Sequence, residues 1–223
     1  MNSKKILVKV CGMRDADNIH AVEQCSMFNI QCSIDLMGFI FWPKSSRYVS
    51  EMPQYLPEKC KRVGVFVDAS IGDVMTIAEQ YQLDFIQLHG QESPSYIAQL
   101  TSHLLTLSPS HPLKIIKALN IATEADLEAA KSYEGIVDYL LFDTKGKSVG
   151  GNGEKFDWSV LNAYQGSTPF LLSGGIGPDD AERVRAFQHP RCVGIDLNSK
   201  FELSPAFKDV KKLQEFIKAL SYE

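Results

Sequence analysis

Short apolar and β-branched runs alternate along this chain with longer segments whose apolar residues recur every three or four positions. The short runs have the length and composition of β-strands, and several show the period of two that separates the faces of a strand. Eight runs are predicted as strands, at residues 6–11, 36–41, 62–68, 85–89, 114–119, 139–143, 170–173 and 192–197.

The longer segments have the apolar spacing of amphipathic helices. Thr123 followed by Asp126 is the kind of start signal that opens a helix at residue 124. Helices are predicted at residues 17–23, 71–81, 94–104, 124–133, from 157 onward, 179–187 and 210–220. After the second strand there is only a weak, proline-interrupted segment at residues 50–59.

Each predicted strand is therefore followed by a helix or a helix-sized segment. Such alternation implies a parallel sheet, and eight strand–helix units that close on themselves make an α/β fold of one (β/α)₈ TIM barrel. A flavodoxin-like sheet would need only about five units. We expect a single phosphate-binding barrel domain over residues 1–223.

Alternate residues of a barrel strand point into the barrel or out toward the helices. In the first strand Ile6, Val8 and Val10 suit the outer face, so Lys9 and Cys11 are expected inside. The same parity places polar or thiol side chains inside, at or near strand ends: Cys11, Asp68, Gln87, His89, Asp143 and Asp196. Any one of them alone fits a turn cap or a core hydrogen bond, but their shared edge indicates an active face.

The stretch from Asp138 to Trp158 repeats this arrangement most clearly. An apolar run ends on Asp143 and is followed by a loop with four glycines, Gly146, Gly150, Gly151 and Gly153. A strand that delivers a carboxylate to the foot of such a loop is typical of the way a barrel presents a catalytic acid.

Two further loops indicate phosphate binding. Gly174 and Gly175 follow the seventh strand, and Asn198 and Ser199 follow the eighth. Barrels commonly bind phosphate in these two loops through backbone N–H groups and a short helix N-terminus, and glycine lets the backbone approach an anion closely. The plain alternative for the glycine pair is a tight turn before Pro178.

Composition excludes several other classes. The 223 residues are 44% hydrophobic and 22% charged, which is near the globular average. The net charge of −4 argues against a nucleic-acid surface. The basic cluster at residues 208–218 has apolar residues at helical spacing, so a solvated helix face is predicted there.

The compartment is predicted to be the cytoplasm. No apolar run approaches the roughly 18 residues of a membrane span, and the polar start at residues 1–5 carries no signal-peptide core. Five cysteines in no paired spacing indicate neither a disulfide framework nor a zinc site.

Several motifs together resemble the phosphoribosylanthranilate isomerase family. They are Lys-Val-Cys-Gly-Met at 9–13, Gly-Phe-Ile-Phe at 38–41, Pro-Lys-Ser-Ser-Arg-Tyr-Val-Ser at 43–50, Arg-Val-Gly-Val-Phe-Val at 62–67, Gln-Leu-His-Gly at 87–90, Phe-Asp-Thr at 142–144, residues 150–158 and Leu-Ser-Gly-Gly at 172–175. The match runs in order along nearly the whole chain. It implies a metal-free and cofactor-free barrel that catalyses an Amadori rearrangement in tryptophan biosynthesis, a branch of aromatic amino acid biosynthesis.

The resemblance also implies roles for single residues. Cys11 corresponds to the general base, Asp143 to the general acid, and Arg47 to the arginine near the anthranilate carboxylate. Substrate contacts are expected at His89 and Asp196, and phosphate contacts at Gly174, Gly175, Asn198 and Ser199. A thiol with a pKa of about 8.5 is mostly un-ionised near neutral pH, so Cys11 needs a cation nearby, and Lys9 is the candidate if it points inward.

One turn departs from the family. Where many members read Ser-Ser-Gly-Val-Glu, this chain reads Asn-Ser-Lys-Phe-Glu at 198–202. Replacing glycine changes the backbone conformations open to the eighth loop, and Lys200 itself offers the phosphate a charge.

Two rival functions remain at this point. Indoleglycerol-phosphate synthase acts on a related sugar phosphate but would need catalytic Lys and Glu at strand ends. A non-enzymatic phosphate-binding barrel would bind ligand without turnover. The expected partner is a small sugar phosphate, with no nucleic acid and no membrane, and the chain is expected to be a monomer or a homodimer. The sequence does not decide between these two states or exclude other sugar phosphates.

Overall fold

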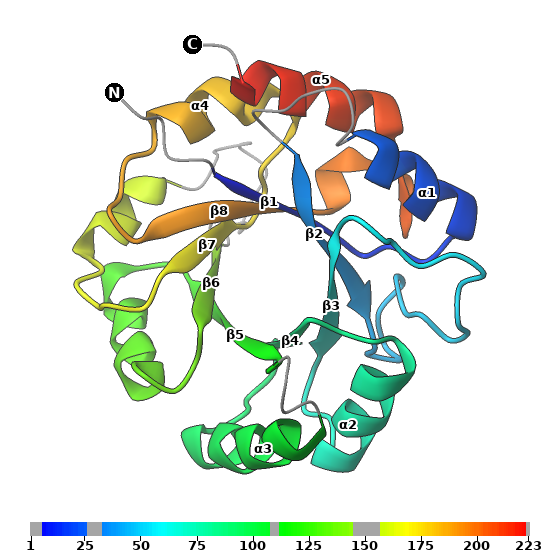
Figure 1. The fold of residues 1–223 in the computed structure, drawn as a ribbon. Coiled ribbons are helices and arrows are strands. Elements are labelled where there is room, and N and C mark those ends of the chain that lie inside the picture. Colours follow the sequence, from blue (N-terminus) through cyan, green and yellow to red (C-terminus); the bar gives the residue numbers. More distant parts are fainter. Residues whose placement is uncertain (1–5, 26–32, 108–111, 145–156, 222–223) are drawn as a thin grey trace.

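The computed structural model describes residues 6–25, 33–107, 112–144 and 157–221, and eight parallel strands within them close into a barrel (Figure 1). The strands are β1 (Leu7–Cys11), β2 (Ile34–Ile40), β3 (Lys61–Phe66), β4 (Phe85–Leu88), β5 (Lys114–Ile121), β6 (Tyr139–Thr144), β7 (Phe170–Ser173) and β8 (Cys192–Leu197). Each strand pairs with the next along the chain, and β8 pairs with β1 to close the ring. The predicted (β/α)₈ barrel is confirmed.

The helices lie around the outside of the ring (Figure 1). They are α1 (Ala16–Gln24), α2 (Ile71–Gln80), α3 (Pro94–Leu107), α4 (Ala181–Ala186) and α5 (Val210–Ser221), with the 3₁₀ segments η2 (Glu124–Tyr133), η3 (Trp158–Ala163), η4 (Pro178–Asp180) and η5 (Ser199–Phe201). Asp15 and Ser70 cap α1 and α2, because their side chains accept hydrogen bonds from amides of the first helical turn. None of the described helices is long and apolar enough to cross a membrane.

Three predicted helices differ in type from expectation. The segments predicted at 124–133 and from 157 onward are 3₁₀ helices, and the segment at 179–187 begins as one. Side chains form hydrogen bonds at the starts of these segments. The Asp157 carboxylate, for example, accepts from both the N–H and the hydroxyl of Ser159. Residues 50–59 form no helix; Pro53 and Pro57 in this segment lack a backbone donor.

Side chains form two packed layers on the two faces of the barrel wall. The larger layer lies between the strands and the helices. The inner layer fills the barrel with residues of every strand: Leu7, Leu36, Val63, Phe85, Ile116, Ala118, Tyr139, Leu141, Leu171 and Val193. Since Leu7 and Leu141 belong to the inner layer, the predicted parity of β1 and β6 is confirmed, and Cys11 and Asp143 continue the inward rows.

A short hairpin lies between β8 and α5. Its strands β9 (Glu202–Ser204) and β10 (Phe207–Lys208) are antiparallel. The Asn18 side chain of α1 holds the hairpin by bonding both backbone groups of Lys208, at 2.9 and 2.7 Å.

Candidate active site

The inward polar residues of four strands gather at the carboxyl end of the barrel. Cys11 ends β1, Asp196 is the last residue but one of β8, and Asp143 is the last but one of β6. Strand register links these three positions: Asp143 pairs with Ser173 of β7, and Asp196 pairs with Lys9 of β1. The Ser173 hydroxyl lies 3.3 Å from Asp196 Oδ2, so a line of polar groups runs from β6 round to β1.

Cys11 is buried against a glycine and a lysine. A Cβ at Gly38, its partner on β2, would lie 2.8 Å from the Cys11 sulfur, so only glycine leaves room for the thiol there. Burial raises the pKa of the Cys11 thiol, and the Lys9 ammonium opposes this effect. The expectation that Lys9 points inward is confirmed, because its Nζ lies 2.8 Å from Asp196 Oδ1 with the lysine side chain fully enclosed.

Lys9 is held in its charged form. Burial alone would lower the pKa of its ammonium, but Asp196 and Cys11 together raise that pKa above the ordinary value. A permanent positive charge therefore stands beside the thiol.

Asp143 has a histidine neighbour across the mouth. His89 Nε2 lies 3.5 Å from Asp143 Oδ2, and both side chains are partly open to solvent. The other ring nitrogen, Nδ1, lies 3.2 Å from the amide nitrogen of buried Gln87. A substrate at this mouth can touch both the carboxyl group and the imidazole.

A buried ion pair supports the loop that carries His89. Lys117 Nζ donates to the Gly90 carbonyl at 2.7 Å and to Glu92 at 2.9 Å, with both charged side chains 1% exposed. Glu92 in turn accepts from the N–H groups of Gly90 and Asp68. Every charge and donor in this cage has a partner, so the cage is structural.

The inward placement predicted for Asp68 is wrong. Strand β3 ends at Phe66, two residues earlier, so the strand alternation does not extend to Asp68. Asp68 is exposed, has a φ of 50°, and accepts from the Gln91 N–H at 2.6 Å. It shapes a loop and does not line the barrel.

Arg47 comes from the loop after β2 and meets the hairpin after β8. Its Nε and Nη2 donate to Glu202 in a fork, at 2.8, 3.1 and 2.6 Å. This bonding raises the pKa of the Arg47 guanidinium. Among the described residues nothing accepts from its Nη1, so the end-on edge of the guanidinium still offers donors.

The prediction that the whole basic cluster 208–218 forms a solvated helix face is wrong for Lys208. Lys208 lies in β10, before α5 begins, and its side chain is fully buried. Its Nζ donates to Asn198 Oδ1 at 2.9 Å and to Glu202 at 2.6 Å. Lys211, on the helix itself, is 84% exposed as predicted. Sequence reasoning thus missed Lys208 and Glu202 as parts of the site.

The two predicted phosphate loops lie side by side. Gly174 and Gly175 have φ of 91° and 72°, a backbone conformation that favours glycine. A Cβ at Gly177 in the same loop would lie 3.8 Å from Lys200 Cβ. Ser199 and Lys200 are exposed at the start of η5, while the Asn198 side chain turns to Lys208.

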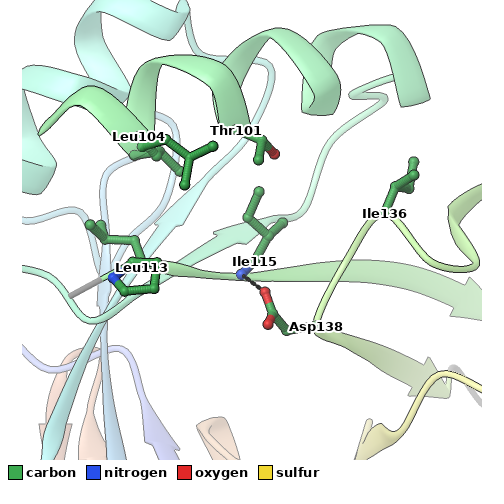
Figure 2. Close-up of a pocket in the computed structure, with 8 residues that line it drawn as sticks. Thr101, Leu104, Leu113, Ile115, Ile136 and Asp138 are labelled. Carbon is green, nitrogen blue, oxygen red and sulfur yellow. Dashed lines mark hydrogen bonds between the residues drawn. The ribbon is translucent and has the colours of Figure 1, made fainter. Parts of the chain in front are cut away.

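Two other features are separate from this site. A pocket of about 70 Å³ lies near the start of β5, at the amino end of the barrel, where Asp138 accepts from the Ile115 N–H (Figure 2). It is apolar apart from Thr101 and Asp138. Within the described parts of the chain no three His, Cys, Asp or Glu side chains gather as a metal site. The four-glycine loop from Gly146 to Gly153 lies outside the described residues.

The chain is similar to known proteins along nearly its full length. Residues 8–219 match the model of the N-(5'-phosphoribosyl)anthranilate (PRA) isomerase family. An N-(5'-phosphoribosyl)anthranilate isomerase from Phocaeicola vulgatus is 46% identical, over 96% of this chain and 98% of that protein.

Solved structures agree with the sequence match. A phosphoribosyl anthranilate isomerase in complex with reduced 1-(o-carboxyphenylamino)-1-deoxyribulose 5-phosphate superposes with a TM-score of 0.74 at 27% identity, covering 96% of this chain and 98% of that one. A monomeric form of the dimeric enzyme from Thermotoga maritima gives a TM-score of 0.72 at 26% identity, with the same coverage.

Proposed function

Because the chain belongs to the N-(5'-phosphoribosyl)anthranilate isomerase family, enzymes of tryptophan biosynthesis, we propose that Cys11 is its general base and Asp143 its general acid. The single observation that carries this proposal is the convergence of both side chains on one polar edge. Their strands are joined there by the Ser173–Asp196–Lys9 contacts. The family membership disfavours the synthase and the non-enzymatic barrel as alternatives.

The substrate is an anthranilate amine joined to C1 of a closed ribose 5-phosphate. Opening that ring requires a proton on the ring oxygen as its bond to C1 breaks. Asp143 donates this proton, and a Schiff base between C1 and the anthranilate nitrogen results.

The Schiff base makes the proton on C2 acidic. Cys11, as thiolate, removes this proton and leaves an enolamine, which tautomerises to the ketone 1-(2-carboxyphenylamino)-1-deoxyribulose 5-phosphate. Each step of acid–base help is worth on the order of 10²–10⁴ in rate. The net reaction is an isomerisation that needs no oxidant, and proton exchange with solvent returns Cys11 and Asp143 to their starting states.

Arg47 is proposed to bind the anthranilate carboxylate. Glu202 occupies the side-on edge of the guanidinium, which leaves the end-on edge for a second, planar carboxylate. Asp196 and His89 are proposed to contact the sugar, because His89 lies 3.5 Å from Asp143, and Asp196 pairs with Lys9, the inward neighbour of Cys11.

The phosphate is proposed to bind between the two loops that end β7 and β8. Gly174, Gly175, Asn198 and Ser199 supply backbone N–H groups there, and the nearby Lys200 adds a positive charge. A cytoplasmic location and a monomer or homodimer stay predictions. The Thermotoga maritima relative is described as dimeric.

Turnover tests the proposal directly. Purified chain added to N-(5'-phosphoribosyl)anthranilate should abolish the fluorescence of the substrate, and the gene should restore growth to a tryptophan auxotroph that lacks this step. Ligand binding without loss of fluorescence would favour the non-enzymatic barrel. Formation of indoleglycerol phosphate from the ketone 1-(2-carboxyphenylamino)-1-deoxyribulose 5-phosphate would favour the synthase.

A further inference from the structure

Lys208 is a buried cation that has no role in the reaction steps proposed above. Its side chain is fully enclosed, and its backbone is held from both sides by the Asn18 amide. Burying an ammonium group is costly, and burial lowers the pKa of Lys208 against the pull of Glu202. Because its burial is costly, the position of Lys208 at the edge of the active site indicates that it has a function there.

Lys208 shares its counter-ion with Arg47. Glu202 accepts from Lys208 at 2.6 Å and from Arg47 at 2.6 to 3.1 Å, and it carries a single negative charge. Its other close neighbour, Asn198, is neutral. By contrast, Lys9 has a carboxylate of its own in Asp196. One positive charge of the Arg47–Glu202–Lys208 cluster is thus left over.

The surplus charge lies beside Cys11. A Cβ at Gly12, the next residue after Cys11, would lie 2.7 Å from Arg47 Cδ and 2.9 Å from Asn198 Oδ1, the acceptor of Lys208. Besides its strand neighbour Lys9, the charged groups that act on the thiol come from three other segments and are Arg47, Asp196 and Lys208. Glu202 pairs with two of them, Arg47 and Lys208.

Three cations therefore act on one thiol, and two carboxylates, Asp196 and Glu202, pair with these cations. With Cys11 protonated the group carries one excess positive charge, and with Cys11 as thiolate its charges balance. We propose that Lys208 is a positioning residue that favours the thiolate of Cys11, and that Glu202 limits this effect while orienting Arg47. The catalytic meaning of this inference rests on the proposed role of Cys11 as base.

Ionisation of the thiol can be measured without turnover. A thiolate absorbs in the ultraviolet, so the difference between a protein and its Cys11→Ser form, followed against pH, reports Cys11 alone and cancels the tyrosines. Lys208→Met should raise the apparent pKa of Cys11 by about one unit, a tenfold loss of thiolate below the midpoint. Lys208→Arg should restore the wild-type midpoint.

Glu202→Gln should have the opposite effect on the Cys11 midpoint, and its side chain has nearly the same shape as that of glutamate. It removes the negative charge, so the Cys11 midpoint should fall by about one unit. Lys211→Met removes one positive charge at an exposed position and should leave the midpoint unchanged. If Lys208→Met does not fold, as judged by circular dichroism, Glu202→Gln carries the test.

Midpoints that stay at the wild-type value in folded Lys208→Met or in Glu202→Gln would overturn the inference. So would a shift of equal size in Lys211→Met, since it would mean that overall charge alone acts. Failure of the proposed function has a different signature: Cys11→Ser would then keep full isomerase turnover, whatever the titration shows.

Discussion

Lys9 Nζ and Asp196 Oδ1 lie 2.8 Å apart, with exposures of 0% and 7%, at the seam where the last strand of the barrel meets the first. Charges enclosed in this way are stable only as a pair, because either one alone would stay buried without compensation. The pair therefore links β8 to β1 at this seam and at the same time fixes a cation beside Cys11.

Removing only one partner of this pair should destabilise the protein more than removing both. Asp196→Asn leaves the Lys9 ammonium uncompensated and should lower the free energy of unfolding by about 3 kcal/mol, measured by urea denaturation. The double variant Lys9→Met/Asp196→Leu removes both charges and should recover most of that loss, yet stay far less active than the wild type. Equal stability of Asp196→Asn and the wild type would contradict the burial argument.

Arg47→Met should raise the KM for N-(5'-phosphoribosyl)anthranilate by about 10- to 100-fold, the worth of a charged hydrogen-bonded contact, with a smaller effect on kcat. Glu202 keeps Lys208 as its partner in this variant, so the protein should stay folded. Steady-state kinetics measures both constants. Arg47→Lys should recover little, because an ammonium cannot bind two carboxylates by separate edges. An unchanged KM in Arg47→Met would move the carboxylate contact elsewhere.

Glu134 should make the free energy of unfolding depend on pH. Its carboxylate accepts from the Tyr164 hydroxyl at 2.6 Å and from both N–H and hydroxyl of Ser167, at 3.1 and 2.7 Å, and Thr168 adds two bonds. Although partial burial acts to raise it, these bonds lower the pKa of Glu134 to about 2. A lowered folded-state pKa means that the stabilisation is complete above pH 4.5 and is lost as pH falls toward 2.

Glu134→Gln tests this pH window. The variant should be about 1–2 kcal/mol less stable than the wild type at pH 7, and the difference should shrink as the pH is lowered through the window. Glu128→Gln is the matched control: Glu128 is 70% exposed and pairs only with Lys131 among the interactions described for it, so it should change stability by less than about 0.5 kcal/mol. A pH-independent difference for Glu134→Gln would refute the linkage.

Gln82 occupies a position that suits glycine. It follows α2 with a φ of 48°, while Gln82 N–H bonds the Glu79 carbonyl and Leu83 N–H bonds the Ala78 carbonyl, the pattern of a Schellman motif. Gln82→Gly should therefore raise the free energy of unfolding by about 0.5–1 kcal/mol, measured in urea. Gly135→Ala, at a φ of 76° with open space around it, should lower the free energy of unfolding by about 1 kcal/mol. Equal signs for the two variants would contradict the conformational argument.

The sequence predicts the barrel because its signals are local. The period of two in β1 and β6 decides which side chains face inward, and Asp15 and Ser70 start their helices through contacts within one turn. The inward placement of Cys11 and Asp143 follows from the same reasoning, since each lies within the last two residues of a regular strand. Asp68 fails because β3 stops two residues before it, and strand ends are poorly marked in sequence.

The remaining parts of the site depend on contacts between distant residues. Arg47 and Glu202 are 155 positions apart, and Lys208 is held by Asn18 across 190 positions. Lys208 stands next to a helix rich in exposed lysines, so its composition indicates a solvated face. Only the hairpin of β9 and β10, which turns it inward onto Glu202, makes it a buried group.

The central claim is that a thiol and a carboxyl group act on one sugar, and single-turnover loss of substrate fluorescence tests it most directly. Cys11→Ser and Asp143→Asn should each slow this step by about 10²–10⁴, while affinity for the reduced product analogue stays near that of the wild type. Cys192→Ser, at the other end of β8, should react at the wild-type rate. Wild-type rates in Cys11→Ser or in Asp143→Asn would contradict the account.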